Sequence, residues 1–402
     1  MIKIKQYITN VYFLTVYFVL FFCTFPGFAK EFKIQYGDFK ILPRIDYNCS
    51  YSTNIYSDNT NKQSDFIHTI TPGISLEKGF ASHNKISAEY SIALVTYNDL
   101  EENNSQDHSL SVSSELKFPA AKTSLNIADN FTRTSDLLGT DNEYNVGRKT
   151  KRWNNSLDTT LAYDFGGKYS LELTYNNTIL RFDDDEDKRQ NRFDNKYGVY
   201  LFYKLTGKTS VFTSFQQTLA EYDDRDDATS QDYTLNDYLI GIRLKPVGRL
   251  HGDASFGYST NKPDNYGNTS SWTANASVNF ETVNKTLLSY SLKRAYKGAP
   301  DEDASSYLDT SMDISLTRSF VNEMSVDFSL NWGHMDYKGE KHGLPSKSFN
   351  KYSAKAGFNW KIVKWINAGV GYEYGQKTAS DSKYEDEEHE INNMYFNFNF
   401  DF

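Results

Sequence analysis

Apolar and polar residues alternate along short runs over most of this chain. Residues 272–280 (WTANASVNF) carry an apolar side chain at every second position, with Thr, Asn or Ser between them, and residues 324–332 (MSVDFSLNW) show the same pattern. Successive side chains of an extended strand point to opposite faces, so each run has one apolar and one polar face. The pattern predicts antiparallel strands that separate an apolar medium from water.

The runs are joined by connections that alternate between short and long. The long connections are rich in charged residues, whereas Gly, Pro and Asn punctuate the short ones. Eight short turns and nine long loops give about eighteen strands, with sixteen as the alternative count, and an even number returns both termini to one side. The short turns are predicted at residues 79–84, 119–122, 166–168, 206–208, 246–249, 282–284, 321–323 and 361–365.

Composition separates a membrane barrel from a soluble β-sandwich. The 402 residues include 30 Tyr and 28 Phe, yet the mean hydropathy is only −0.64. Aromatic residues such as Phe118, Tyr163 and Phe280 lie beside short turns, as in the interfacial girdle of a barrel. We therefore predict an all-β fold, a transmembrane antiparallel up-and-down β-barrel in the cell outer membrane, with short periplasmic turns and long extracellular loops.

The N-terminus has the pattern of a secretory signal peptide. Lys3 and Lys5 precede an apolar run at 8–25, and small residues end at Ala29. We predict a signal peptide at 1–29, a short periplasmic segment at 30–39 and the barrel at 40–402; an uncleaved membrane anchor is the alternative. Cleavage takes the formal charge from −9 to −11, which disfavours nucleic acid as a partner. Of the cysteines only Cys49 would remain, which excludes an internal disulfide.

Two segments fit the alternation less well. Asp129 falls on the face that Leu125 and Ile127 turn to lipid, which requires either a bulge or a position at the membrane interface. Residues 209–219 (TSVFTSFQQTL) do not sort cleanly into two faces.

Residues 42–79 contain Leu42-Pro43, Asn54-Ile55 before a polar loop, and a Ser-Asp-Phe-Ile strand that leads to Pro72-Gly73. This stretch resembles the start of the putative outer-membrane beta-barrel porin family that is often found beside exopolysaccharide or exosortase genes. Family members usually carry Asp-Asn where this chain has Thr53-Asn54. The resemblance implies export or passive passage without fixing a substrate.

The chain ends with an aromatic residue at every second position. This ending resembles the insertion signal of bacterial outer-membrane proteins, which implies the barrel-assembly machinery as a partner. The alternative is a terminal strand without a signalling role. The predicted signal consists of Phe396, Phe398, Phe400 and Phe402.

We find no motif for catalysis. None of the seven histidines lies in a recognisable catalytic motif, and His334 shares the outward face of Trp332. Acidic clusters at 183–187, 223–227 and 385–388 are predicted to be solvated loops, with Ca²⁺ or shared lipopolysaccharide ions as the alternative. We therefore predict no enzyme, no cofactor and no metal site.

Basic residues follow several of the short turns, for example Lys85, Lys122 and Lys168. They have two interpretations, contact with lipid headgroups or ordinary solubility.

A barrel of 16–18 strands is wide enough for an aqueous channel. We therefore predict a water-filled pore that passes hydrophilic solutes or exports a polysaccharide, in contact with outer-membrane lipid and lipopolysaccharide. A structural or adhesive barrel without a pore is the alternative, and a barrel enzyme is less favoured. Tyr200 and Phe202 are candidates for stacking on sugar rings. The predicted pore-lining residues are Glu172, Tyr200, Phe202, Lys204, Arg243, Asp253, Glu281, Lys293, Asp313, Asp327, Lys355 and Glu373.

Overall fold

The computed structural model describes residues 34–80, 84–137, 149–223, 231–246, 248–265, 267–282, 285–298, 306–320, 323–338 and 347–401. Nearly all of these residues form strands, and the 3-10 helices among them lie in connections. The predicted signal peptide at 1–29 lies outside the described residues. The strands are β1 (Ile34–Tyr36), β2 (Phe39–Ser52), β3 (Asp65–Phe80), β4 (Asn84–Tyr97), β5 (Ser105–Phe118), β6 (Thr123–Leu137), β7 (Lys149–Gly166), β8 (Tyr169–Phe182), β9 (Arg192–Lys204), β10 (Thr209–Tyr222), β11 (Tyr233–Leu244), β12 (Leu250–Pro263), β13 (Thr269–Glu281), β14 (Thr286–Gly298), β15 (Ser306–Ser319), β16 (Met324–Lys338), β17 (Ser348–Val363), β18 (Ile366–Ala379) and β19 (His389–Asp401).

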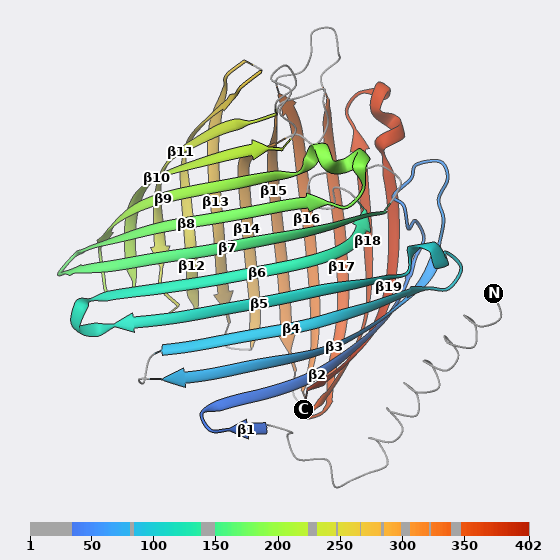
Figure 1. Ribbon diagram of the computed structural model, residues 1–402, viewed down its shortest axis with the longest axis horizontal. Helices are drawn as coiled ribbons and strands as arrows, with labels where there is room; N and C mark the ends of the chain where they lie inside the picture. The colour runs from blue at the N-terminus through green and yellow to red at the C-terminus, as the bar shows by residue number, and fades with distance from the viewer. Residues whose placement is uncertain are drawn as a thin grey trace.

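The sheet closes on itself. Each strand from β2 to β19 pairs antiparallel with its neighbour in sequence, and β19 returns to β2 from Asn393↔Ser52 to Asp401↔Arg44. The described residues therefore form the predicted barrel with eighteen wall strands, β2 to β19, and not sixteen (Figure 1). The remaining strand, β1, is a short hairpin partner of β2, with Ile34 opposite Ile41.

The connections follow the predicted alternation. All eight predicted short turns join consecutive strands at the end of the barrel where β19 also ends, and the nine longer loops lie at the other end. Among the described residues, four connections contain 3-10 helices: η2 (Glu101–Asn103), η3 (Pro119–Ala121), η4 (Asp185–Gln190) and η5 (Ser382–Glu387). With short turns at the periplasmic side, η2, η4 and η5 belong to extracellular loops and η3 to a periplasmic turn.

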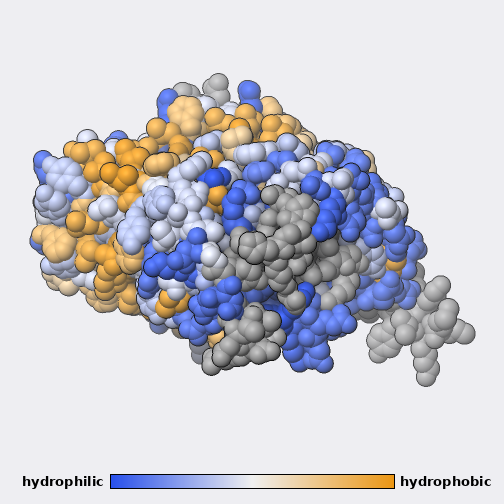
Figure 2. Space-filling model, turned by 90° about the horizontal axis from the view of Figure 1, so that it is seen from above, coloured by the Kyte–Doolittle hydropathy of each residue, from blue (hydrophilic) through white to orange (hydrophobic). Residues whose placement is uncertain are grey.

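The outer face of the barrel is apolar. Ile240 is 67% exposed and Phe256 58%, although Phe256 stacks on Trp272 of the neighbouring strand β13. Seen from above, apolar residues gather along the left and upper margins, and hydrophilic residues occupy the middle and right of the view (Figure 2). Such a belt is stable in hydrocarbon and unfavourable in water, as expected for a membrane wall.

Asp129 lies on the outer face without a bulge. The β5–β6 and β6–β7 registers run through it unbroken, opposite Val112 and Leu157. Its carboxylate accepts a hydrogen bond from Asn155 Nδ2 at 2.9 Å. On the strands that follow, the outward Asn177 and Asn195 are also bonded to each other, at 2.9 Å. The bulge is therefore excluded, and the position of Asp129 at the membrane interface stays a prediction.

Residues 209–219 sort into two faces once β10 is paired. Val211 and Phe215 face outward with Tyr203 and Val199, their partners on β9. Phe212 therefore points into the barrel, opposite Phe202. An aromatic residue on the inner face obscured the alternation in the sequence.

Candidate functional site

The inner face of the barrel carries the candidate site. The registers place all twelve predicted pore-lining residues on it, because Glu172 lies opposite Tyr200, Arg243 opposite Asp253, and Lys355 opposite Glu373. Some of them meet: Arg243 forms an ion pair with Glu172 at 3.0 Å. The placement is consistent with a polar lumen whose charges are mixed in sign.

An aromatic cluster lies on the inner face of β9 and β10 towards the periplasmic end. The Tyr200 and Phe202 rings are stacked with centroids 6.2 Å apart, and Phe212 packs on Phe202 at 5.3 Å. The guanidinium of Arg243 lies 4.5 Å from the Phe202 centroid. Phe202 and Phe212 are each only 5% exposed. The suggestion that Phe202 stacks on sugar rings is therefore wrong, because Arg243 and neighbouring rings cover it.

Phe212 belongs to this cluster and was missed from the sequence. A Cβ atom at Gly241, opposite Phe212, would lie 2.4 Å from the Phe212 ring. The absence of a side chain at Gly241 thus gives the ring its space. The alternation of Val211, Thr213 and Phe215 would have indicated the inward position of Phe212.

The extracellular end of the lumen is partly filled by the hairpin formed by the outer ends of β14 and β15, residues 295–298 and 306–309, here called the inserted hairpin. The β13–β14 ladder stops at Ala274↔Arg294, so β14 leaves the wall beyond that pair. Tyr296 and Leu308 then pack against Leu235 on the inner face of β11. Asn261 of β12 donates a hydrogen bond to Ser306 at 3.0 Å.

Burial confirms that both faces of the inserted hairpin are covered. Ser306, Tyr307, Leu308 and Asp309 are 1%, 0%, 2% and 8% exposed in succession. In a barrel wall at the lipid boundary, every second residue of such a run would be exposed. The alternation of apolar and polar residues did not indicate the insertion, because it predicts long connections of this kind to be extracellular loops.

The second face of the inserted hairpin meets β16, β17 and the last extracellular loop. Tyr307 stacks on Tyr337 with centroids 5.3 Å apart, and Phe349 joins the same cluster. From the last loop, Glu387 of η5 forms ion pairs with Lys347 at 2.9 Å and Lys377 at 3.6 Å. The loop acids at 385–388 thus include a group with a structural role, in contrast to the solvated loop that was predicted.

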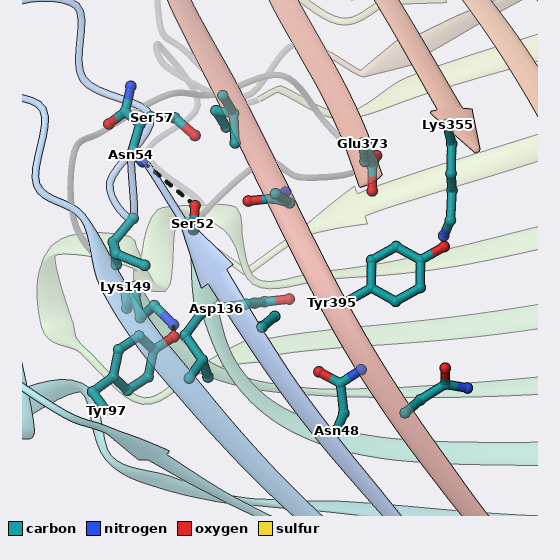
Figure 3. A pocket seen from close by; sticks show the side chains of 16 residues that line it. Asn48, Ser52, Asn54, Ser57, Tyr97, Asp136, Lys149, Lys355, Glu373 and Tyr395 are labelled. Carbon is teal, nitrogen blue, oxygen red and sulfur yellow. Dashed lines mark hydrogen bonds between the residues drawn. The ribbon is translucent and has the colours of Figure 1, made fainter. Parts of the chain in front are cut away.

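A polar cavity of about 500 Å³ remains beside β2, β3 and β19 (Figure 3). Lys149 and Tyr97 are hydrogen-bonded at one side of it. At the other side Lys355 lies over the ring of Tyr395, 4.9 Å from its centroid. Tyr395 was also missed, although its inward position follows from the outward alternation of the last strand.

The terminal aromatic residues lie where the alternation predicts. Phe396 is 55% and Phe398 38% exposed on the outer face, and Phe400 pairs with Ile45 of β2 and Ile366 of β18. Phe402 lies outside the described residues. A role of these residues in membrane insertion stays a prediction.

The histidine and the acidic clusters considered in the sequence analysis make structural contacts. His334 stacks on Trp332 on the outer face, the face that the alternation predicts for both residues. Acidic residues of the β8–β9 loop form ion pairs, such as Asp183 with Arg133 at 2.8 Å. Within the described part of the chain, no three or more His, Cys, Asp or Glu residues gather as a metal site would require.

The basic residues after the short turns differ in direction. Lys85 pairs with Glu77 at 3.0 Å on the inner face, and Lys122 lines a cavity of the lumen. Lys168 instead lies on the outer face over the ring of Tyr203, 5.5 Å from its centroid. The basic residues after the short turns therefore do not all face the lipid, so contact with headgroups cannot be a role that they share.

Comparison with known proteins adds a family. The family model described as "Putative beta-barrel porin 2" matches residues 32–399. No curated protein matches the chain.

Solved outer-membrane structures are similar at low identity. Pseudomonas aeruginosa OccK5 (OpdH) is 11% identical with a TM-score of 0.48, over 90% of this chain and 98% of that one. The FrpB iron transporter from Neisseria meningitidis is 10% identical with a TM-score of 0.45, over 85% of this chain and 63% of that one, so this chain spans less than two thirds of its length. A bacterial polysaccharide outer membrane secretin is 10% identical with a TM-score of 0.36, over 90% and 98% of the two chains.

Proposed function

The chain belongs to the putative beta-barrel porin 2 family and is a porin-like outer-membrane β-barrel, and on that premise we propose that it forms a water-filled channel for small hydrophilic solutes. The observation that carries the proposal is an inner face lined with charged and hydroxyl side chains around cavities of about 500 and 790 Å³ at its two ends. Charged groups buried in a closed, packed barrel would need partners throughout, whereas a wet lumen solvates them.

Small solutes fit this channel better than a polysaccharide chain. The inserted hairpin and η5 occupy part of the extracellular end, and their contacts include the fully buried Tyr307 and Phe349. A polymer would require these contacts to open. Polysaccharide export therefore needs a rearrangement that passage of a small solute does not.

Single-channel recording tests the proposal. The purified barrel, refolded in detergent and inserted into a planar bilayer, is expected to conduct in 1 M KCl, with stable steps. Circular dichroism before insertion checks that the protein is a β-barrel. Repeated insertion without current would favour the alternative, a structural or adhesive barrel, and we propose no catalytic role in either case.

We also propose that the terminal aromatic residues are read by the barrel-assembly machinery. Phe396 and Phe398 present a regular outward row on the last strand, next to the β19–β2 seam that closes the barrel. Removal of Phe402 is expected to lower the amount of folded protein in the outer membrane without preventing refolding in detergent. Equal amounts in the membrane would contradict this role.

A further inference from the structure

The periplasmic end of the lumen contains a cavity of about 790 Å³ with a positive lining, here called the periplasmic vestibule. It lies at the ends of strands β5 to β11, just inside the short turns. Five basic and two acidic side chains line it, in a chain whose formal charge is −9. The basic residues are Lys117, Lys122, Lys204, Arg243 and Lys245, and the acidic residues are Asp164 and Glu172.

Both acidic side chains of the vestibule are already paired. Lys204 Nζ lies 2.6 Å from Asp164 Oδ2, and Arg243 Nη1 lies 3.0 Å from Glu172 Oε2. The vestibule therefore has a formal excess of three positive charges, carried by exposed lysines at 117, 122 and 245. Like charges held in one concave site repel each other, and a bound anion relieves that repulsion.

The turns of the barrel bring these lysines together. Lys122 follows η3 with a left-handed φ of 51°, which turns the chain sharply back into β6. Across from it, Gly166 has a φ of 83° at a register shift in the β7–β8 pair. A Cβ atom at Gly166 would lie 3.1 Å from Lys122 Nζ, so the glycine keeps room for the ammonium group.

Arg243 supplies a donor of fixed orientation. Its guanidinium lies over Phe202 at 4.5 Å and near Phe212 at 5.8 Å, and Glu172 holds one of its nitrogen atoms. Its side chain is still 37% exposed. A planar guanidinium held by ring faces and a carboxylate loses little further freedom when it binds a second oxyanion, and its fork matches carboxylate and phosphate oxygens.

We propose that the periplasmic vestibule binds solutes that carry a carboxylate or phosphate group, and that it makes the channel anion-selective. This inference rests on the proposed channel function for its effect on transport, but the binding itself does not require current. The field of the uncompensated lysines concentrates anions in the vestibule, and Arg243 orients them.

Reversal potentials in a KCl gradient test the selectivity. The native barrel is expected to pass chloride in preference to potassium. The triple variant Lys117→Gln, Lys122→Gln and Lys245→Gln should lower the chloride-to-potassium permeability ratio severalfold. A matched triple variant, Lys285→Gln, Lys361→Gln and Lys364→Gln, removes the same charge near the periplasmic turns but outside the vestibule, and should change the ratio less.

Titration calorimetry of the detergent-refolded barrel tests the binding independently of conduction. Citrate and inorganic phosphate are the two probes, and they distinguish a carboxylate site from a phosphate site. Binding of either probe that is lost in the vestibule triple but kept in the control triple supports the proposal. The absence of binding by both probes, or equal loss in the two triples, overturns it. A barrel that binds a probe but conducts no current contradicts only the channel function.

Discussion

The inner wall of the barrel is open at one end of the lumen and covered at the other. At the periplasmic end the wall stays open, and five basic side chains line a cavity of about 790 Å³. At the extracellular end the wall is covered by the inserted hairpin, where Tyr307 and Phe349 are 0% exposed. One end can therefore select by charge, and the other narrows the passage by packing.

This difference arises from the connections that follow the strands at each end of the barrel. At the periplasmic end, short turns return each strand at once. At the extracellular end, β14 and β15 extend beyond the last pair of the β13–β14 ladder and turn inward. Two strands of ordinary length, 13 and 14 residues, thus supply an internal obstacle without a separate domain.

Removal of the inserted hairpin should have the largest effect on this comparison. Replacement of residues 295–309 by Asn-Gly joins Arg294 to Thr310, which are already opposite each other, through a tight turn. The extracellular end should then resemble the periplasmic end in width. We expect a severalfold increase in single-channel conductance, because the narrowest part of the lumen dominates its resistance.

Shortening of the β12–β13 loop, residues 264–268, provides the control for this deletion. It removes residues of another extracellular loop and keeps the cluster around Tyr307. Its conductance should match that of the native barrel. If the hairpin deletion also leaves conductance unchanged, the extracellular end is not the narrow part.

The substitution Gly241→Ala should disturb the vestibule through Phe212. The new Cβ atom would lie 2.4 Å from the ring and 2.5 Å from the Ala254 carbonyl oxygen. Such overpacking typically costs about 1–3 kcal/mol of folding free energy. Urea unfolding in detergent measures that cost, and the displaced ring should also reduce anion selectivity.

Gly375→Ala is the matched control, since a Cβ atom there meets no atom within 4 Å and the residue also lies in a wall strand. This variant should unfold at nearly the native urea concentration. Equal losses of stability in the two variants would show that the close contact with Phe212 does not cause the loss in Gly241→Ala.

The substitution Glu172→Gln should have the smallest effect, and it sharpens the electrostatic side of the comparison. Removal of this carboxylate leaves Arg243 without its ion-pair partner at 3.0 Å and adds one positive charge to the vestibule. The chloride-to-potassium permeability ratio should rise, by less than the change seen on removal of three lysines. Glu373→Gln, at the extracellular cavity, is the control with a smaller expected change. A fall of the ratio in Glu172→Gln would contradict a net positive vestibule.

Much of the barrel could be predicted from the sequence. All eight short turns lie where they were predicted, seven of them at segments that contain Gly, Pro or Asn, and the wall strands number eighteen. The alternation also sets the faces, as the outward Phe396 and Phe398 show. These features depend on neighbours along the chain, and the strict period of two leaves little choice of face.

The candidate site could be predicted only in part. The inner position of Phe202 followed from alternation, but its burial beneath Arg243 depends on a strand two places away in the sheet. Likewise, Lys122 and Lys168 stand in equivalent positions after short turns, yet one lines the lumen and the other covers an outward ring. Local spacing does not determine the direction of a flexible side chain at a turn.

The closed barrel follows from the residue pattern alone, because an alternating strand has to place one face in hydrocarbon and one in water, and unpaired edges cannot remain in a membrane. The side chains that fill the lumen, in contrast, are known only from the folded barrel. Tyr296 and Leu308 meet Leu235 across more than fifty residues of chain, and the excess charge of the vestibule comes from side chains of several turns and strands. Such contacts depend on the curvature and register of the whole barrel, which no single segment of the sequence encodes.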